Sequence, residues 1–154
     1  MSNGLITYDP SLTSILFGGI ELIDTDLEGY VDIVYPDAGF MHQAGRNQST
    51  RSKSTDRSAV ATVHVLENST TEYNLTNIFN GDYLSRNGSG ILEFTVSQTT
   101  TLNRGSQIVS VTRNLCTAAE SYIKQLPNRS IGNKNGINDW VIQLNCVSNL
   151  IAST

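Results

Sequence analysis

Charged side chains are scarce in this sequence. They make up 16 % of the 154 residues, and the formal net charge is −4, whereas globular domains average about 25 % charged residues. A disordered tail combines high net charge with low hydrophobicity, so the low charge argues against one. A general nucleic-acid binder carries a strongly basic surface, and the slightly acidic balance argues against that class as well.

Cysteine is equally scarce. Cys116 and Cys146 are the two cysteines, and neither belongs to a Cys-x-x-Cys pair or lies near paired histidines. The spacing therefore indicates neither a zinc site nor a disulfide framework, and we expect free, buried thiols. One alternative stays open: if strands at 117–126 and 139–147 are hairpin partners, the two cysteines could face each other.

Common catalytic motifs are also absent. The sequence has no G-x-S-x-G, P-loop, H-E-x-x-H or dinucleotide-binding glycine pattern. We expect His64 to be a packed or half-buried strand residue and His42 to lie on the surface. Alternating Asp24, Asp26 and Glu28 could bind Ca²⁺ or act as a catalytic pair, but the rest of an EF-hand loop is missing, which favours a solvated acidic turn. We expect no enzymatic activity, no cofactor and no metal.

Targeting signals and membrane spans are missing too. The first four residues lack a basic region followed by an apolar run, so no secretory signal is expected. No segment approaches the roughly 20 apolar residues of a membrane span. These observations predict synthesis in the cytosol.

Neutral polar residues take the place of the missing charge. The chain contains 17 Ser, 16 Thr and 15 Asn, and hydrophobic residues reach 38 %. These polar side chains suit strands, turns and caps better than long helices. The length is typical of one domain. We therefore expect a single, mainly β domain over residues 1–154.

The charges that are present are segregated along the chain. Residues 1–45 carry seven acids and no Lys or Arg, whereas residues 46–57 carry four bases and one acid. Between 43 and 56 the only apolar side chain is Ala44, which predicts a long mobile loop or arm at about 43–57. The two charge clusters could attract neighbouring copies head to tail, or could simply be two solvated faces.

Apolar periodicity predicts the strands. Gly18-Gly19 between apolar runs at 12–17 and 20–23 is typical of a two-residue hairpin turn. Residues 57–66 alternate and have apolar residues on both faces, which predicts a central strand. Further strands are expected at 29–35, 91–97, 107–112, 118–126 and 140–147, with turns at 87–88 and 103–105.

One helix is expected after the central strand. Ser69 and Glu72 fit a capping box, and Asn80-Gly81 fits a helix end. The apolar stripe between them consists of Tyr73, Leu75, Ile78 and Phe79. Residues 113–126 fit a helix or a strand, and the alternation around Tyr122 favours a strand.

Several segments, in this order, resemble small tail tube proteins of contractile-tailed bacteriophages. They are Tyr8-Asp9-Pro10, Ile15-Leu16-Phe17-Gly18-Gly19, Gly45, the R-S-K-S-T-D-R-S block at 51–58 that runs into a strand, a short helix, and a late strand containing Trp140. The R-S-K-S-T-D-R-S block is the most specific of these.

The resemblance implies a β-sandwich or rolled antiparallel sheet with one short flanking helix. It also implies hexameric rings in which the sheets join into a closed barrel, and stacking of these rings into a tube through which genome DNA passes. The implied partners are further copies of the chain and the tail sheath, tape measure and baseplate or terminator proteins, and the implied location is the virion tail.

The arm is the predicted contact between rings or subunits. Its contact residues are Arg46, Arg51, Lys53, Asp56 and Arg57. The alternative function is a non-enzymatic β-sandwich binding or adhesion module of a phage particle, which would be a monomer or a trimer.

Overall fold

The computed structural model describes residues 4–36, 39–132 and 134–148. Its first half contains short elements: β1 (Leu5–Tyr8), the 3-10 helix η1 (Pro10–Leu12), β2 (Ser14–Phe17), β3 (Ile20–Glu21), β4 (Val31–Val34), β5 (Phe40–Ala44) and β6 (Ser49–Lys53). Longer elements follow: β7 (Ala59–Leu66), α1 (Thr70–Leu84), β8 (Leu92–Arg104), β9 (Gln107–Gln125) and β10 (Ile137–Ser148). The predicted mainly β class with one helix is confirmed.

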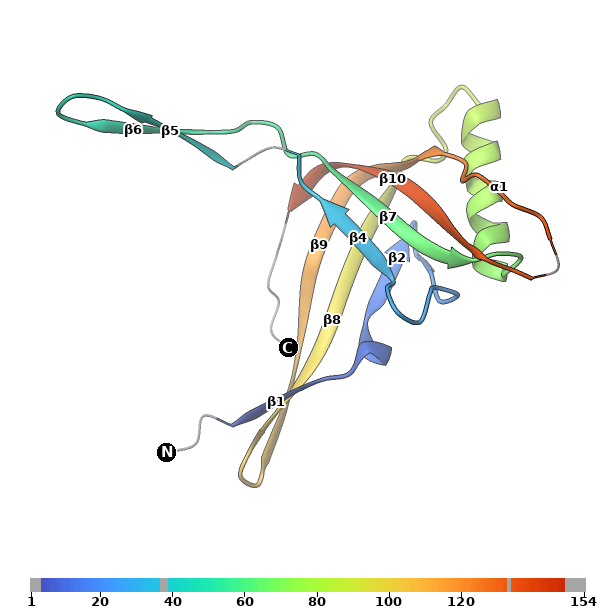
Figure 1. Cartoon of the computed structure of the whole chain (residues 1–154), viewed down its shortest axis with the longest axis horizontal. Coiled ribbons are helices and arrows are strands. Elements are labelled where there is room, and N and C mark those ends of the chain that lie inside the picture. The colour runs from blue at the N-terminus through green and yellow to red at the C-terminus, as the bar shows by residue number, and fades with distance from the viewer. Residues whose placement is uncertain (1–3, 37–38, 133, 149–154) are drawn as a thin grey trace.

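An antiparallel eight-stranded sheet forms the body (Figure 1). Its order is β3-β2-β8-β9-β10-β7-β4, and β1 pairs with β8 beside β2. The sheet is rolled, and the segment 22–26 bridges from β2 to β7 across it. The Leu22 N–H donates to the Ile15 carbonyl on β2, and the Asp26 N–H donates to the His64 carbonyl on β7.

The central strand predicted at 57–66 is β7, and it lies inside this sheet. Ala59, Ala61, Val63 and Val65 of β7 are buried on one face, and β7 pairs with β10 and β4 on its two sides. The core on that face also contains Trp140, Phe17 and Phe94, which are fully buried. The Gly18-Gly19 turn is confirmed, with φ of 63° and 82°, values that glycine adopts without steric cost.

The β8–β9 hairpin is much longer than its sequence pattern predicts. The expected strands at 91–97 and 107–112 continue to a turn at 105–106, and residues 113–125 are strand, not helix. The extended part of the hairpin contains threonines that pair across the two strands, and it lacks a pattern of alternating apolar residues. The Thr99 and Thr112 hydroxyls, for example, lie 3.0 Å apart. Cross-strand pairing of this kind stabilises a ladder without a buried apolar stripe.

Helix α1 starts as expected and ends later than expected. The Ser69 hydroxyl accepts from the Glu72 N–H at 3.2 Å, as an N-cap does, but the helix continues past Gly81 to Leu84. Gly81 does not adopt the left-handed conformation of a helix C-cap, so it costs helix stability without ending the helix. Of the predicted apolar stripe, Leu75 is buried and Tyr73 is 67 % exposed.

The two cysteines are both free and do not face each other. Cys116 is buried and pairs with Val96 on β8, whereas Cys146 is exposed, so the expectation that both are buried was wrong for Cys146. Strands β9 and β10 are neighbours, but their register places Val147 opposite Ala118. Burial raises the pKa of the Cys116 thiol. No helix in the described part of the chain has the length and apolar character needed to cross a membrane.

Candidate functional site

The arm is a β-hairpin that extends away from the body (Figure 1). Strands β5 and β6 form a separate two-stranded sheet whose register runs from Phe40 opposite Lys53 to Ala44 opposite Ser49. The segment predicted as a mobile loop or arm at about 43–57 is thus an arm that begins earlier, at Phe40, and its residues 40–53 form a hairpin. Cross-strand backbone hydrogen bonds form this hairpin although none of its side chains is buried, so hydrophobic periodicity does not reveal it.

Few interactions hold the arm by itself. Every residue of β5 and β6 is exposed. The Arg51 guanidinium lies 4.2 Å from the centroid of the Phe40 ring, a cation–π contact. At the tip, a Cβ on Gly45 would lie 2.5 Å from the Gln48 carbonyl oxygen, so this tight turn requires glycine. An isolated two-stranded hairpin is marginally stable in water, so the arm contributes little stability of its own.

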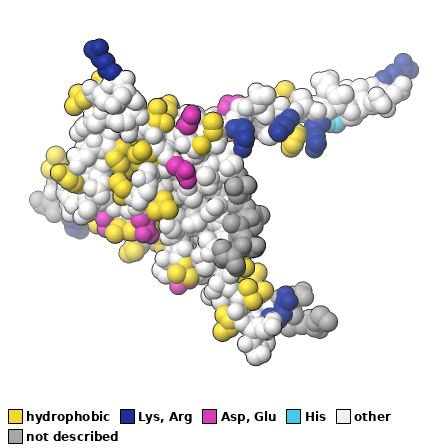
Figure 2. Space-filling model, turned by 180° about the vertical axis from the view of Figure 1, so that it is seen from behind, with side chains coloured by type: hydrophobic (Ala, Val, Ile, Leu, Met, Phe, Trp, Pro, Cys, Tyr) yellow, Lys and Arg dark blue, Asp and Glu magenta, His cyan; other side chains and the backbone are white. Residues whose placement is uncertain are grey.

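The predicted contact residues divide between the hairpin and its base. Arg46, Arg51 and Lys53 lie on the hairpin, and Lys and Arg side chains line the arm in Figure 2. Asp56 and Arg57 lie in the link to β7. The Asp56 carboxylate accepts from the Ser58 N–H at 3.1 Å, and the Arg57 carbonyl accepts from the Val147 N–H at 2.9 Å. The structure thus places three of the predicted residues along the hairpin and the other two in the link at its base.

The acidic candidates Asp24, Asp26 and Glu28 do not converge. An Asp24 carboxylate oxygen accepts from the Thr71 N–H and hydroxyl at 3.2 and 2.9 Å, in the first turn of α1. Asp26 accepts from the Glu28 N–H at 3.4 Å, as in an acidic turn. Within the described ranges, no group of three or more His, Cys, Asp or Glu side chains is arranged to hold a metal ion.

His64 forms a cluster that the sequence pattern did not show. Its Nδ1 lies 2.6 Å from Asp139 on β10 and its Nε2 lies 2.9 Å from Asp32 on β4, so three neighbouring strands meet at one imidazole. Hydrogen bonds to Asp139 and then to Asp32 raise the pKa of His64 above its usual value. The expected half-buried strand histidine is confirmed, with a side chain that is 22 % exposed.

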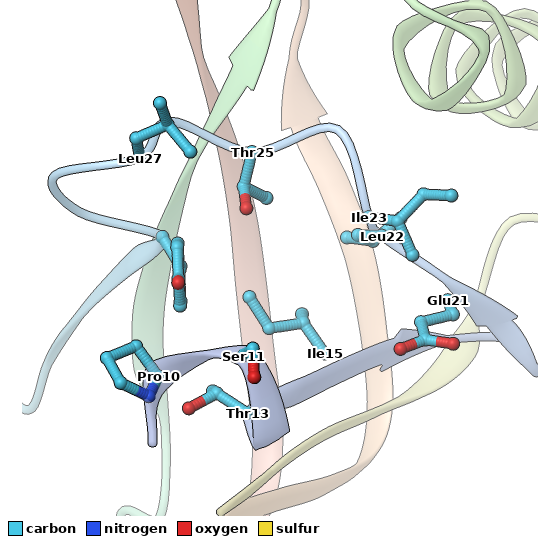
Figure 3. Close-up of a pocket in the computed structure, with 10 residues that line it drawn as sticks. Pro10, Ser11, Thr13, Ile15, Glu21, Leu22, Ile23, Thr25 and Leu27 are labelled. Atoms are coloured by element: carbon cyan, nitrogen blue, oxygen red, sulfur yellow. The ribbon is translucent and has the colours of Figure 1, made fainter. Parts of the chain in front are cut away.

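Two adjoining hollows lie between η1 and the segment 21–31. They measure about 250 and about 370 Å³ and share Pro10, Thr13, Leu27 and Tyr30 in their walls. Figure 3 shows the first hollow, with Pro10 and Thr13 on one side and Leu27 on the other. Glu21 lines the first and Glu28 the second, and no Lys or Arg lines either.

The rims of these hollows are acidic and apolar. Leu27 is 93 % exposed, and Ile23 and Leu12 are also exposed large apolar residues. Asp9, next to Pro10, accepts hydrogen bonds from the Ser11 hydroxyl and N–H, and these bonds lower the pKa of Asp9. The region therefore combines uncovered apolar side chains with carboxylates.

The edges of the sheet offer further contact surfaces. On one edge β1 exposes Leu5, Ile6 and Tyr8, and on the other β4 ends at exposed Val34, which exposed Tyr35 follows. In the described part of the chain, β10 pairs with β9 only along residues Thr117 to Gln125 of β9. Backbone groups along such edges can pair with another chain.

A solved structure supplies a likeness in fold. No protein-family model matches the chain, and no curated protein matches it in sequence. A chain in the cryo-EM structure of the anti-feeding prophage cap, the AFP tube terminating cap, matches with a TM-score of 0.58 at 11 % sequence identity. The match covers 95 % of this chain and 92 % of that chain. The two chains therefore share one fold across nearly their whole lengths.

Proposed function

We propose that this chain is a structural subunit of the tail tube of a bacteriophage or phage-like particle. In this proposal six copies form a ring, and rings stack into the conduit for DNA ejection. The observation that carries it is the likeness in fold to a tube terminating cap over 95 % of the chain. The sequence resemblance to tail tube proteins points to the same class.

Free sheet edges support ring formation. In one copy, β1 and β4 lie at opposite edges of the same sheet, and both edges expose apolar side chains. Pairing the edges of neighbouring copies satisfies their backbone groups and covers these side chains. A closed ring of six copies leaves no free edge.

The arm supports stacking of rings. It projects from the body, it is basic, and the rest of the chain carries a net charge of −7. Arg46, Arg51 and Lys53 form its contact surface, and Asp56 and Arg57 position its base. A contact between unlike surfaces repeats from ring to ring, and so builds an open tube.

Other partners follow from a place in the virion tail. The outer surface of the tube meets the tail sheath, its lumen holds the tape measure protein and transiently DNA, and its ends meet baseplate and terminator proteins. This function requires no cofactor and no catalytic residue.

A second candidate function is that of a tube-end subunit. The specific observation favouring it is that the structural neighbour is a tube terminating cap. A terminating subunit forms a ring on the end of the tube and does not extend it. The two candidates therefore differ in whether the purified protein stacks without limit.

Negative-stain electron microscopy of the purified protein, with size-exclusion chromatography, tests both. Long hollow tubes support the tube subunit, and single rings of fixed size support the tube-end subunit. A monodisperse monomer or trimer at all concentrations contradicts both and supports the binding-module alternative.

A further inference from the structure

We propose that the arm of one copy docks into the two adjoining hollows of a neighbouring copy, between η1 and the segment 21–31. This inference rests on the proposed tube function and adds the receiving surface for the arm. The occupant of the hollows is thus a second copy of this chain.

Charge complementarity selects this surface. The hairpin presents Arg46, Arg51 and Lys53, whereas the walls of the hollows contain Glu21 and Glu28 and no cation. Residues 1–45 contain no Lys or Arg at all. This arrangement of the two copies brings a positive surface against a negative one. It is favoured over arrangements that bring like charges together, because like charges repel.

Apolar side chains on both partners fit the same pairing. At the base of the arm, Phe40 and Met41 are 52 % and 67 % exposed. Around the hollows, Leu12, Ile23 and Leu27 are exposed. Exposed ion pairs contribute little individually, so covering these apolar side chains supplies much of the stability of the contact.

The arm cannot fill the hollows of its own chain in this conformation. Figure 1 shows β5 and β6 pointing away from the body, with the loop before β4 at the opposite end of β4 from the arm. The contact is therefore between copies and joins two different surfaces. Such a heterologous contact leaves the arms free at one end of a stack and the hollows free at the other, as a growing tube requires.

Paired charge reversals test the docking. We expect Arg51→Glu/Lys53→Glu and Glu21→Lys/Glu28→Lys each to prevent stacking at low salt. An equimolar mixture of the two proteins should stack again in alternation. The acidic arm of the first meets the basic hollows of the second, and the unchanged basic arm of the second meets the unchanged acidic hollows of the first. Sedimentation and electron microscopy measure the assembled fraction, and circular dichroism checks that each variant is folded.

Matched controls separate docking from total charge. Arg86→Glu/Lys134→Glu changes the net charge as much as the arm variant, and Glu93→Lys/Glu120→Lys as much as the hollow variant. Both should assemble like the unchanged protein, and mixing the second with the arm variant should leave most of the arm variant unassembled. Normal stacking by Glu21→Lys/Glu28→Lys overturns the docking site, and so does a mixture that fails to stack.

A cross-link tests the contact without long assemblies. In a Cys146→Ser background, Arg51→Cys is mixed with Glu28→Cys and oxidised. We expect a disulfide-linked dimer from the mixture, and a ladder of multimers when one chain carries both substitutions. If the unchanged protein forms tubes and no cross-link appears, the docking site is wrong and the tube function stands. If the unchanged protein forms neither rings nor tubes, the tube function itself fails.

Discussion

His64 and Asp139 lie opposite each other on β7 and β10, and the His64 Nδ1 lies 2.6 Å from an Asp139 carboxylate oxygen. Asp32 on β4 approaches the other ring nitrogen at 2.9 Å. An imidazolium donates to both carboxylates, whereas a neutral imidazole donates to one. The cluster therefore links three strands most strongly when His64 is protonated.

The His64 cluster predicts a pH-dependent contribution to stability. Because the pKa of His64 is raised in the folded protein above its ordinary value of 6.5, the contribution is fully present below about pH 6.5. It is lost as the pH rises through the folded pKa. We expect His64→Gln to remove this contribution, which amounts to less than about 1 kcal/mol at this partly exposed site.

Urea unfolding at several pH values measures the effect of His64→Gln. The matched control is His42→Gln, which changes an exposed histidine on the arm. A pH dependence that survives in His64→Gln contradicts the assignment. Titration of the His64 ring by NMR gives the folded pKa independently.

The burial of Leu75 predicts that this residue contributes strongly to the stability of the packing between α1 and the sheet. It is fully buried, whereas Tyr73 on the same helix is 67 % exposed. We expect Leu75→Ala to lower the free energy of unfolding by about 2–5 kcal/mol, because it opens a cavity in the core. Tyr73→Ala should change it by less than about 0.5 kcal/mol. Fluorescence of Trp140 follows unfolding, and equal losses in the two variants would show that the helix is packed differently.

The buried Glu72 carboxylate on α1 predicts an energetic coupling to Arg129 in the loop before β10. Glu72 is 2 % exposed, and its carboxylate accepts from the Arg129 guanidinium at 2.8 Å and from the Asn138 amide at 2.6 Å. Arg129→Met leaves the buried charge with fewer partners, and we expect a loss of about 2 kcal/mol or more.

A double-mutant cycle measures that coupling. Glu72→Gln/Arg129→Met should be less destabilised than the sum of the two single variants, because the uncompensated charge is gone. Additive losses would mean that the ion pair contributes nothing of its own. Lys134→Met is the control for removal of an exposed cation from the same loop.

Shortening the arm separates ring formation from ring stacking. Residues 41–52 are replaced by Asn-Gly, a two-residue turn that joins the paired residues Phe40 and Lys53. We expect rings and no tubes, because the sheet edges are unchanged and the arm is absent. Electron microscopy distinguishes the two, and long tubes from the shortened protein would exclude the arm from stacking. Deletion of 46–55, which also removes part of the link to β7, should likewise prevent stacking.

The sequence by itself determined those elements that depend on interactions between residues close together in the chain. The turn at Gly18-Gly19 forms because two glycines adopt positive φ. The buried face of β7 follows from the alternation of its side chains, and the start of α1 follows from the Ser69 N-cap. Each depends on neighbours within a few residues. For that reason such features are predictable without knowledge of the rest of the fold.

Tertiary structure alone decided the features that join distant segments. His64 meets carboxylates 32 and 75 residues away, and Glu72 meets Asn138 66 residues away. Likewise, the hollows are lined by the segment after β3, which bridges from β2 to β7. The basic arm was visible in the sequence as charge, but its hairpin was not, since backbone pairing between strands without buried side chains leaves no apolar period. Such contacts depend on which strands become neighbours, and the rolled sheet, not any local pattern, determines that.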